Sequence, residues 1–238
     1  MALTSTPYDT PNNTLATAQT SGSISYSAGQ PIILEVANAT SVTLTPSSSA
    51  GLSWTLLGSN TGNGGGAFVW YAIPASAGTT TVTVTGSGGW YGDMRVTTYT
   101  GAGTPIYVNN GYTNVGSSVI SQLVNPTSSG SALWMTISDT DGNFNPAVIP
   151  GTGCSDSVGF YSSGSVCAEF LYPTTNPLTS NSAFTLSGTT SGLCKTSWVA
   201  YEVPSATGGG GGGSTSDPCA FTTQFGGASY RNTFGLRR

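Results

Sequence analysis

Apolar residues along the chain often recur at every second position, which is the spacing of β-strands and not of helices. The alternation is clearest in Thr79–Thr85 (TTTVTVT), where Val82 and Val84 face one way and Thr81, Thr83 and Thr85 face the other. Ala67–Ile73 (AFVWYAI) is apolar and aromatic throughout, which predicts a strand buried on both faces. Glycine, threonine and proline are dense enough to argue against any helix longer than a turn.

Both segments belong to a predicted three-stranded meander, Phe68–Gly101, which carries most of the strong pattern in the first half of the chain. Turns are expected at Pro74–Gly78 and Gly86–Gly89, and Trp90–Thr100 is the third strand. Outside the meander, strands are expected at Ser23–Tyr26, Pro31–Val36, Ser41–Thr45, Ser53–Leu57, Ser117–Val124 and Ser131–Ser138.

A degraded copy of the meander appears in the second half of the chain. The matching pairs are Glu169–Tyr172 with Phe68–Tyr71, Ala183–Gly188 with Thr81–Gly86, and Ser197–Val203 with the strand around Arg95–Thr100. The match places Phe184 on Val82 and Leu186 on Val84. Each half has only enough strands for about one sheet, and a sandwich needs two. We therefore predict an all-β protein, a jelly-roll-like two-sheet β-sandwich built from two related meanders, with extended N-terminal and C-terminal arms.

The domain boundaries follow from the repeats and from Gly208–Gly213, six consecutive glycines that predict a flexible tether. The predicted organisation is an N-terminal arm (1–20), a β-sandwich domain (21–207, with pseudo-repeats at about 21–103 and 104–207), a glycine-rich linker (208–216) and a C-terminal docking arm (217–238). Two small domains are the alternative, although no linker separates the repeats. The loop Gly101–Gly111 between them carries Ile106, Tyr107 and Val108, which look packed or paired.

Charged residues make up 6% of the chain, far below the roughly 25% of an ordinary domain. Three of the five basic residues lie in the last eight positions, so the body has no basic face for nucleic acid. No apolar run approaches the ~20 residues of a membrane span. The aromatic content can still supply a core, and the serine, threonine and asparagine content suits a surface exposed outside the cell.

The opening MALTSTPYDTPNNT lacks the charged and apolar regions of a secretory signal. Two explanations fit: a leader has been removed, or the protein is made in the cytosol and released by lysis, as a virion component is. The second is favoured.

Four cysteines, Cys154, Cys167, Cys194 and Cys219, fit no zinc spacing, and the chain has no histidine to complete such a site. In an oxidising compartment they would form two disulfides, Cys154 with Cys167 and Cys194 with Cys219. Free buried thiols are an equal alternative.

The absence of histidine excludes Ser-His-Asp and Cys-His catalysis. Paired carboxylates could support glycoside hydrolysis, and Glu169 and Glu202 lie on matching strands of the repeat. Carboxylates on strands are far more often solvated, so neither catalysis nor a cofactor is expected from the set Asp93, Asp139, Asp141, Asp156, Glu169 and Glu202. The run Asp139–Asn143 resembles a calcium loop, but Pro150 stands where an EF-hand requires glutamate, so we predict a turn and no metal site.

Two sets of aromatic residues are candidates for binding. Trp90 and Tyr91 follow a glycine-rich turn, where rings can stack on a sugar or bury in a partner, or else cap the core. The arm beyond the linker is predicted to dock on a neighbouring subunit through aromatic and basic side chains, with a disordered end as the alternative. Its candidate residues are Phe221, Phe225, Tyr230, Phe234, Arg237 and Arg238.

The order SWTLLGSN, a glycine loop, FVWYAIPASAGTTTVTVTGSG and MRVTTYTGAG resembles a recurring β-sandwich domain. It is similar to the pattern "GNTWT … LWYAKNVAGGATTVTVTFSG … VAEYSGV" of bacterial surface proteins and of minor tail proteins of actinobacterial phages. The resemblance covers roughly residues 25–205, including the later SSVISQLVNPTSSGSALWMTISDTDG and SWVAYEVPSA. The family's usual glutamate in the "AEYSG" strand is Thr98 here. The resemblance implies a jelly-roll-like sandwich used for display, adhesion or virion structure.

We therefore expect a non-enzymatic structural or adhesive subunit of an extracellular assembly: a phage virion protein of the minor tail, fibre or decoration type. A secreted prokaryotic surface adhesin or filament subunit is the alternative, and a carbohydrate-binding module is third. The expected partners are other virion or filament subunits in a homo-oligomer, and a host-surface glycan. The expected location is the virion, or alternatively the cell surface or medium.

Overall fold

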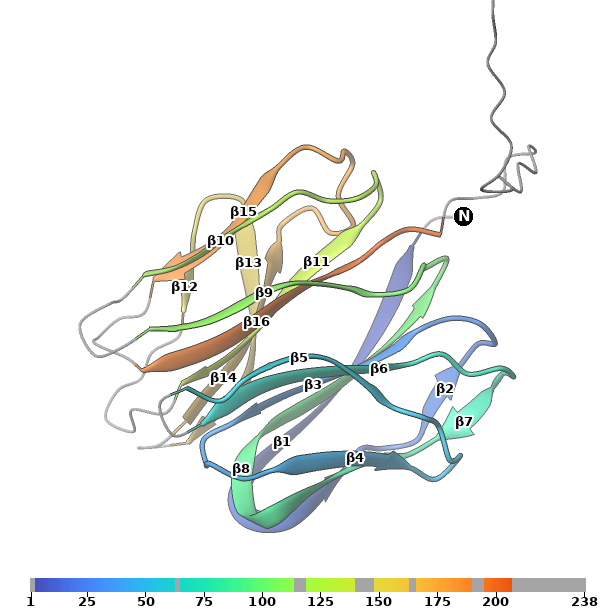
Figure 1. Ribbon diagram of the computed structural model, residues 1–238, viewed down its shortest axis with the longest axis vertical. Coiled ribbons are helices and arrows are strands. Elements are labelled where there is room, and N and C mark those ends of the chain that lie inside the picture. Colours follow the sequence, from blue (N-terminus) through green and yellow to red (C-terminus); the bar gives the residue numbers. More distant parts are fainter. Residues whose placement is uncertain are drawn as a thin grey trace, which may run out of the picture. The chain divides into compact units, whose positions relative to one another are not determined.

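The computed structural model describes residues 3–62, 65–113, 119–139, 148–162, 166–189 and 195–206. Almost all regular structure in these residues is β-strand, as predicted (Figure 1). The strands are β1 (Thr4–Thr20), β2 (Ile24–Tyr26), β3 (Ile32–Asn38), β4 (Leu44–Ser48), β5 (Thr55–Asn60), β6 (Gly66–Ala72), β7 (Gly78–Thr80), β8 (Val82–Thr100), β9 (Ile106–Thr113), β10 (Val119–Val124), β11 (Ala132–Asp139), β12 (Ile149–Pro150), β13 (Cys154–Ser162), β14 (Val166–Pro173), β15 (Phe184–Thr189) and β16 (Thr196–Val203).

Two large antiparallel sheets form the centre of the described unit. One runs β1-β8-β3-β6-β5 and the other runs β13-β14-β11-β16-β9. They pack face to face in the same order, with β1 on β13, β3 on β11, β6 on β16 and β5 on β9. The core between them includes Ile33, Val69, Phe170, Val199 and Tyr201. The two-sheet β-sandwich expected from the sequence is therefore present, and its jelly-roll connectivity stays a prediction.

Each large sheet is covered on its other face by a smaller layer. Over the first sheet lie β4, the paired strands β2 and β7, and the N-terminal part of β8. Val82 and Val84, in this part of β8, are fully buried. Over the second lies the sheet β10-β15-β12, with Leu186 fully buried. Because they are covered on both sides, the central strands β3 and β16 are buried along their whole length. This double burial explains why both strands are mainly apolar, although each also buries polar residues, among them Glu35 in β3 and Glu202 in β16.

The two halves of the chain pair their strands in the same order. In the first half the order is β1-β8-β3-β6-β5, and in the second it is β9-β16-β11-β14-β13. The strands of each series also follow one another in the same sequence order along the chain. Each half contributes one large sheet and the layer that covers it, which is the arrangement that a duplicated sequence produces. Because the two sheets face each other, β1 of one half lies on β13 of the other, and β5 lies on β9.

Four segments differ from the sequence-based expectation. Residues 4–20 of the expected N-terminal arm form β1, which pairs with β8 from Thr4 opposite Thr100 to Thr20 opposite Thr83. The turn expected at Gly86–Gly89 lies inside the long strand β8. The segments Ile106–Thr113 and Cys154–Ser162, which no predicted strand covers, are β9 and β13. An edge strand tolerates the prolines and polar residues of β1, so its composition did not mark it as a strand.

The described residues form one compact unit, which lies within Met1–Gly208. The predicted linker and docking arm lie outside the described residues. Among the residues that are described, no helix is long and apolar enough to cross a membrane.

Candidate functional site

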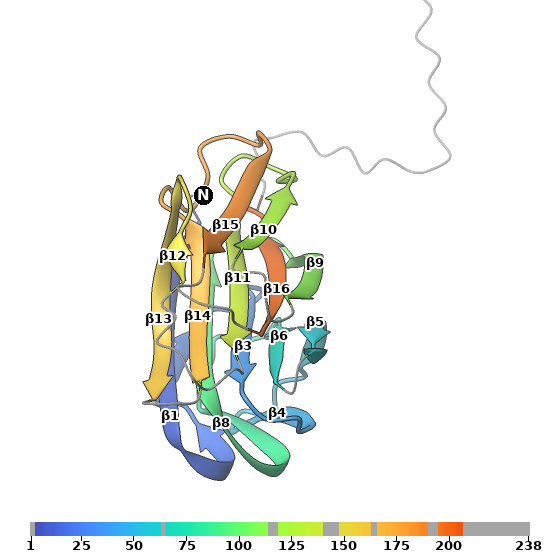
Figure 2. The same ribbon diagram turned by 90° about the vertical axis from the view of Figure 1, so that its left-hand side faces the viewer.

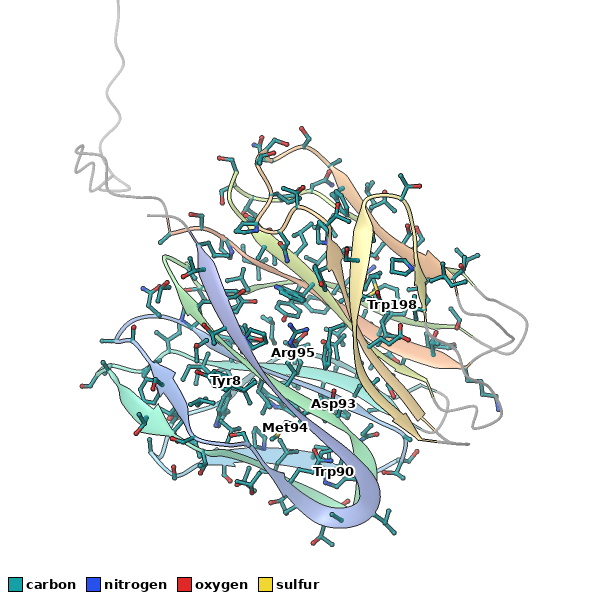
Figure 3. The ribbon with its side chains drawn as sticks, turned by 180° about the vertical axis from the view of Figure 1, so that it is seen from behind. Tyr8, Trp90, Asp93, Met94, Arg95 and Trp198 are labelled. Carbon is teal, nitrogen blue, oxygen red and sulfur yellow. The ribbon has the colours of Figure 1, made fainter. Side chains whose placement is uncertain are left out.

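The predicted recognition role of Trp90 is wrong, because its side chain is fully buried. The ring packs in the core of the first half, and a Cβ atom at Gly86 would lie 2.6 Å from its Cδ1 atom. The glycine-rich run before Trp90 therefore makes room for a buried ring, where the sequence had indicated an exposed turn. Figure 3 shows Trp90 near the bend of the β1–β8 ribbon. The side chain of Tyr91 lies outside the described residues.

The predicted disulfide between Cys154 and Cys167 is also wrong. In the β13–β14 hairpin Cys154 lies opposite Pro173, whereas Cys167 lies opposite Tyr161. The two cysteines are thus about 20 Å apart along the strands, and a disulfide needs Cα atoms within about 7 Å. Cys154 is a buried free thiol, and its Sγ atom is 3.5 Å from the carbonyl oxygen of Thr185. Cys194 and Cys219 lie outside the described residues.

The carboxylates of Glu169 and Glu202 lie on the same face of the second large sheet but do not meet. Glu169 is level with Ile137 and Glu202 is level with Leu133, four residues further along β11. The separation along the strands is about 13 Å, beyond the ~9.5 Å upper limit of a glycosidase pair.

Both carboxylates accept hydrogen bonds from nearby donors. The Val148 backbone N–H donates to both oxygens of Glu169 at 2.7 and 2.8 Å. Glu202 Oε1 accepts from Thr127 N–H, Thr127 Oγ1 and Ser131 Oγ at 2.6–2.8 Å.

Most of the Asp139–Asn143 run, predicted to be a turn, and all six candidate residues of the C-terminal arm lie outside the described residues. Within the described ranges, no group of three or more acidic, cysteine or histidine side chains is placed to hold a metal ion.

A charged pair lies buried between the two large sheets. Glu35 on β3 and Arg95 on β8 are opposite each other in the first sheet, with Nε of Arg95 3.9 Å from Oε2 of Glu35. Thr136, on the facing sheet, donates its hydroxyl to Oε1 of Glu35 at 2.9 Å. The guanidinium carbon of Arg95 lies 4.5 Å from the ring centroid of Trp134 and 4.9 Å from that of Phe170. Arg95 thus reaches from one half of the molecule to aromatic rings of the other, between the two halves (Figure 3).

Two tyrosines complete this cluster. Burial, reinforced by the negative charge of Glu35, raises the pKa of both Tyr99 and Tyr201 above its usual range. Their side chains are enclosed by both sheets, so the whole cluster is closed to solvent. Its chemistry fits a contact that fixes how the halves stack, and it offers no path for a substrate.

A shallow depression of about 230 Å³ opens on the surface of the first half. Its described lining residues are Thr40, Ser41, Val42, Thr43, Thr61 and Gly65. They supply hydroxyl groups, and none of them supplies the aromatic ring on which a sugar would stack.

The most distinctive feature of the surface is a set of exposed apolar side chains on β5, β9 and β10. Because these three strands contain no charged residue, we call the surface that they form the neutral side. Six of the nine large apolar residues that are exposed in the described part of the chain lie on these three strands. They are Leu56, Ile106, Tyr107, Tyr112, Val119 and Leu123. Each strand is the edge of a different sheet, and Figure 2 shows the three along one side of the unit. Such clustering marks an interaction surface more often than scattered exposed residues do.

Side-chain hydrogen bonds connect the three edge strands β5, β9 and β10 into one continuous surface. Asn110 of β9 donates to the carbonyl oxygen of Ser59 in β5 at 2.7 Å, and Asn109 donates to Oε1 of Gln122 in β10 at 2.8 Å. Tyr107 packs over Gly58, where a Cβ atom would lie 2.7 Å from the ring. The sequence had indicated packing at 106–108, but only the pairing of sheets shows that these strands are neighbours.

Comparison of the chain with protein-family models, with curated proteins and with solved structures gives no match.

Proposed function

We propose that the chain is a non-enzymatic structural subunit of an extracellular assembly, and that this assembly is a phage virion in which it serves as a minor tail, fibre or decoration protein. The observation that carries the proposal is the neutral side. A row of exposed apolar side chains on three edge strands is costly in a solitary protein and useful in an assembled one.

The interior supports the same role. The buried carboxylates Glu35, Glu169 and Glu202 each accept hydrogen bonds from hydroxyl or backbone donors that hold the fold together. They act as structural contacts, because buried polar groups in folded proteins are hydrogen-bonded. The virion assignment itself rests on the resemblance of the strands around Ala67–Thr100 to phage minor tail proteins.

Fractionation of the source organism tests the proposal. Particles sedimented from the medium of a lysing culture are compared with washed cell envelopes and cytosol by quantitative mass spectrometry of this chain. Enrichment in the particles, together with capsid or tail proteins, is the expected result. Enrichment in the envelope would favour the surface adhesin or filament subunit, and recovery in the cytosol alone would contradict both.

A further inference from the structure

The two lateral sides of the described unit are built from equivalent strands. One is the neutral side, and the other is formed by β1, β13 and β12 (Figure 2). By the order of pairing, β9 occupies in its half the place that β1 occupies in the other, and β5 corresponds to β13. The topology alone thus gives both sides the same kind of open sheet edges. Any difference in how they meet solvent or a partner must come from their residues.

The sequences of the two sides differ in the features that control edge pairing. β1 contains Pro7, Asp9 and Pro11, β13 contains Asp156, and β12 ends at Pro150. Proline removes a backbone donor and charge resists a second strand, so these residues protect an edge. β5, β9 and β10, described in full, contain neither proline nor any charged residue. One side is protected against pairing and the equivalent side is left open.

We infer that the neutral side binds a second copy of this chain, related by a two-fold axis. A surface without charge meets an identical surface without like-charge repulsion, which is the requirement of an isologous contact. A head-to-tail contact would place the neutral side against the opposite side, formed by β1, β13 and β12. That contact is disfavoured, because those strands carry Asp156 and the prolines Pro7, Pro11 and Pro150. The inference rests on the proposed function, because it names the partner of that same surface.

The C-terminal arm is a less suitable occupant of this surface. Its arginines, Arg231, Arg237 and Arg238, call for acidic partners, and the three strands of the neutral side supply none. The arm is accordingly expected to act elsewhere, and its removal is expected to leave the pair intact.

Sedimentation equilibrium of the purified full chain tests the inference. The smallest associated species is predicted to have twice the monomer mass of 24.0 kDa, and larger species of the full chain are predicted to be built from this dimer through the C-terminal arm. Leu56→Lys and Leu123→Lys place a charge on the neutral side at residues that are 51% and 56% exposed. Each variant is expected to raise the dissociation constant at least about tenfold, because a charge would then be buried in an apolar contact that offers it no partner. Leu15→Lys, at a residue of β1 that is 65% exposed, is the matched control and is expected to change nothing.

Circular dichroism first establishes that each variant keeps its β-structure. A dimer that survives truncation after Thr207, survives Leu15→Lys and is weakened by both other variants supports the inference. A monomer at every concentration overturns it while leaving recovery in particles unaffected. A dimer that is indifferent to Leu56→Lys and Leu123→Lys, or that disappears with the arm, also overturns it.

Discussion

At the scale of residues, several of the scarce charged side chains in the described part of the chain are buried. Glu35 and Arg95 are almost fully buried between the two halves. A buried pair of this kind contributes little net stability compared with apolar packing, but loss of one partner leaves the other charge uncompensated. Its value is in specifying one way for the sheets to stack, because only that stacking brings Thr136 and the rings of Trp134 and Phe170 to the pair.

Replacing Glu35 by glutamine removes the buried negative charge that lies 3.9 Å from Nε of Arg95. We expect a loss of about 3–5 kcal/mol in the free energy of unfolding, measured by urea denaturation. The double variant Glu35→Gln with Arg95→Met should lose less than the sum of the two single variants. Additive losses, or a single-variant loss under about 1 kcal/mol, would show that the pair does not act as a unit.

The two buried tyrosines predict how stability responds to alkali. The pKa of Tyr99 and that of Tyr201 are raised on folding, so above pH ~10 the unfolded chain releases protons that the folded chain retains. Their contribution is fully present below that pH and falls as pH rises, by about 1.4 kcal/mol per pH unit for each tyrosine. Urea denaturation at pH 8–11 measures this slope. Tyr99→Phe should reduce it, and Tyr112→Phe, at an exposed residue, should leave it unchanged.

At the scale of elements, the long ribbon of β1 and β8 joins the inner and outer layers of the first half. Residues 82–86 of β8 pair with β4, and residues 92–98 pair with β3. The ribbon bends between these parts, where the pairing of β1 with β8 shifts register between Asn12 and Ala18. Close approach at the bend requires glycine: a Cβ atom at Gly92 would overlap the carbonyl oxygen of Ala37 and lie 2.8 Å from Cα of Asn38.

Two glycines of the same strand test this account of the bend. Gly92→Ala should lower the free energy of unfolding by roughly 1–3 kcal/mol or more, because backbone atoms cannot move aside as a side chain could. Gly88→Ala should be nearly neutral, since its Cβ would meet only a Val42 methyl group at 3.7 Å. Thermal unfolding of the two variants side by side measures the difference. Equal melting temperatures would contradict the geometry at the bend.

The sequence predicted the elements whose side chains alternate or are continuously apolar. Val82 and Val84 are buried as their alternation required. Residues 67–72 of the predicted strand Ala67–Ile73 fall on the largely buried strand β6, whereas Ile73 lies outside it and is exposed. It did not predict β1 or β13, whose prolines, serines and aspartates are tolerated only because these are edge strands. The sequence did not predict that Trp90 is buried. A glycine-rich run has the same composition whether it forms an exposed turn or leaves space for a buried ring.

The candidate site was hidden from the sequence for a different reason. Its residues come from β5, β9 and β10, and their adjacency exists only after two sheets and a covering layer have stacked. The available signal was the absence of charge from three segments with outward apolar residues. In a chain with only 6% charged residues that absence is weak evidence by itself. It became informative when the equivalent side was found to carry prolines and aspartates.

At the scale of the whole molecule, two large sheets, one from each half of the chain, pack face to face. The charged pair lies between the two stacked sheets, and the neutral side is the surface proposed to bind a second copy. Beyond the described unit, residues 217–238 form the arm predicted to dock on a further subunit through Phe221, Phe225, Tyr230 and Phe234. The account therefore expects two separable levels of association, one for each surface.

Sedimentation velocity of the full chain beside a version ending at Thr207 tests this central claim most directly. The account predicts that the shortened chain sediments as a dimer and that the full chain forms a larger species across the same concentration series. Monomers in both samples, at every concentration, would contradict the claim that this protein works by assembly.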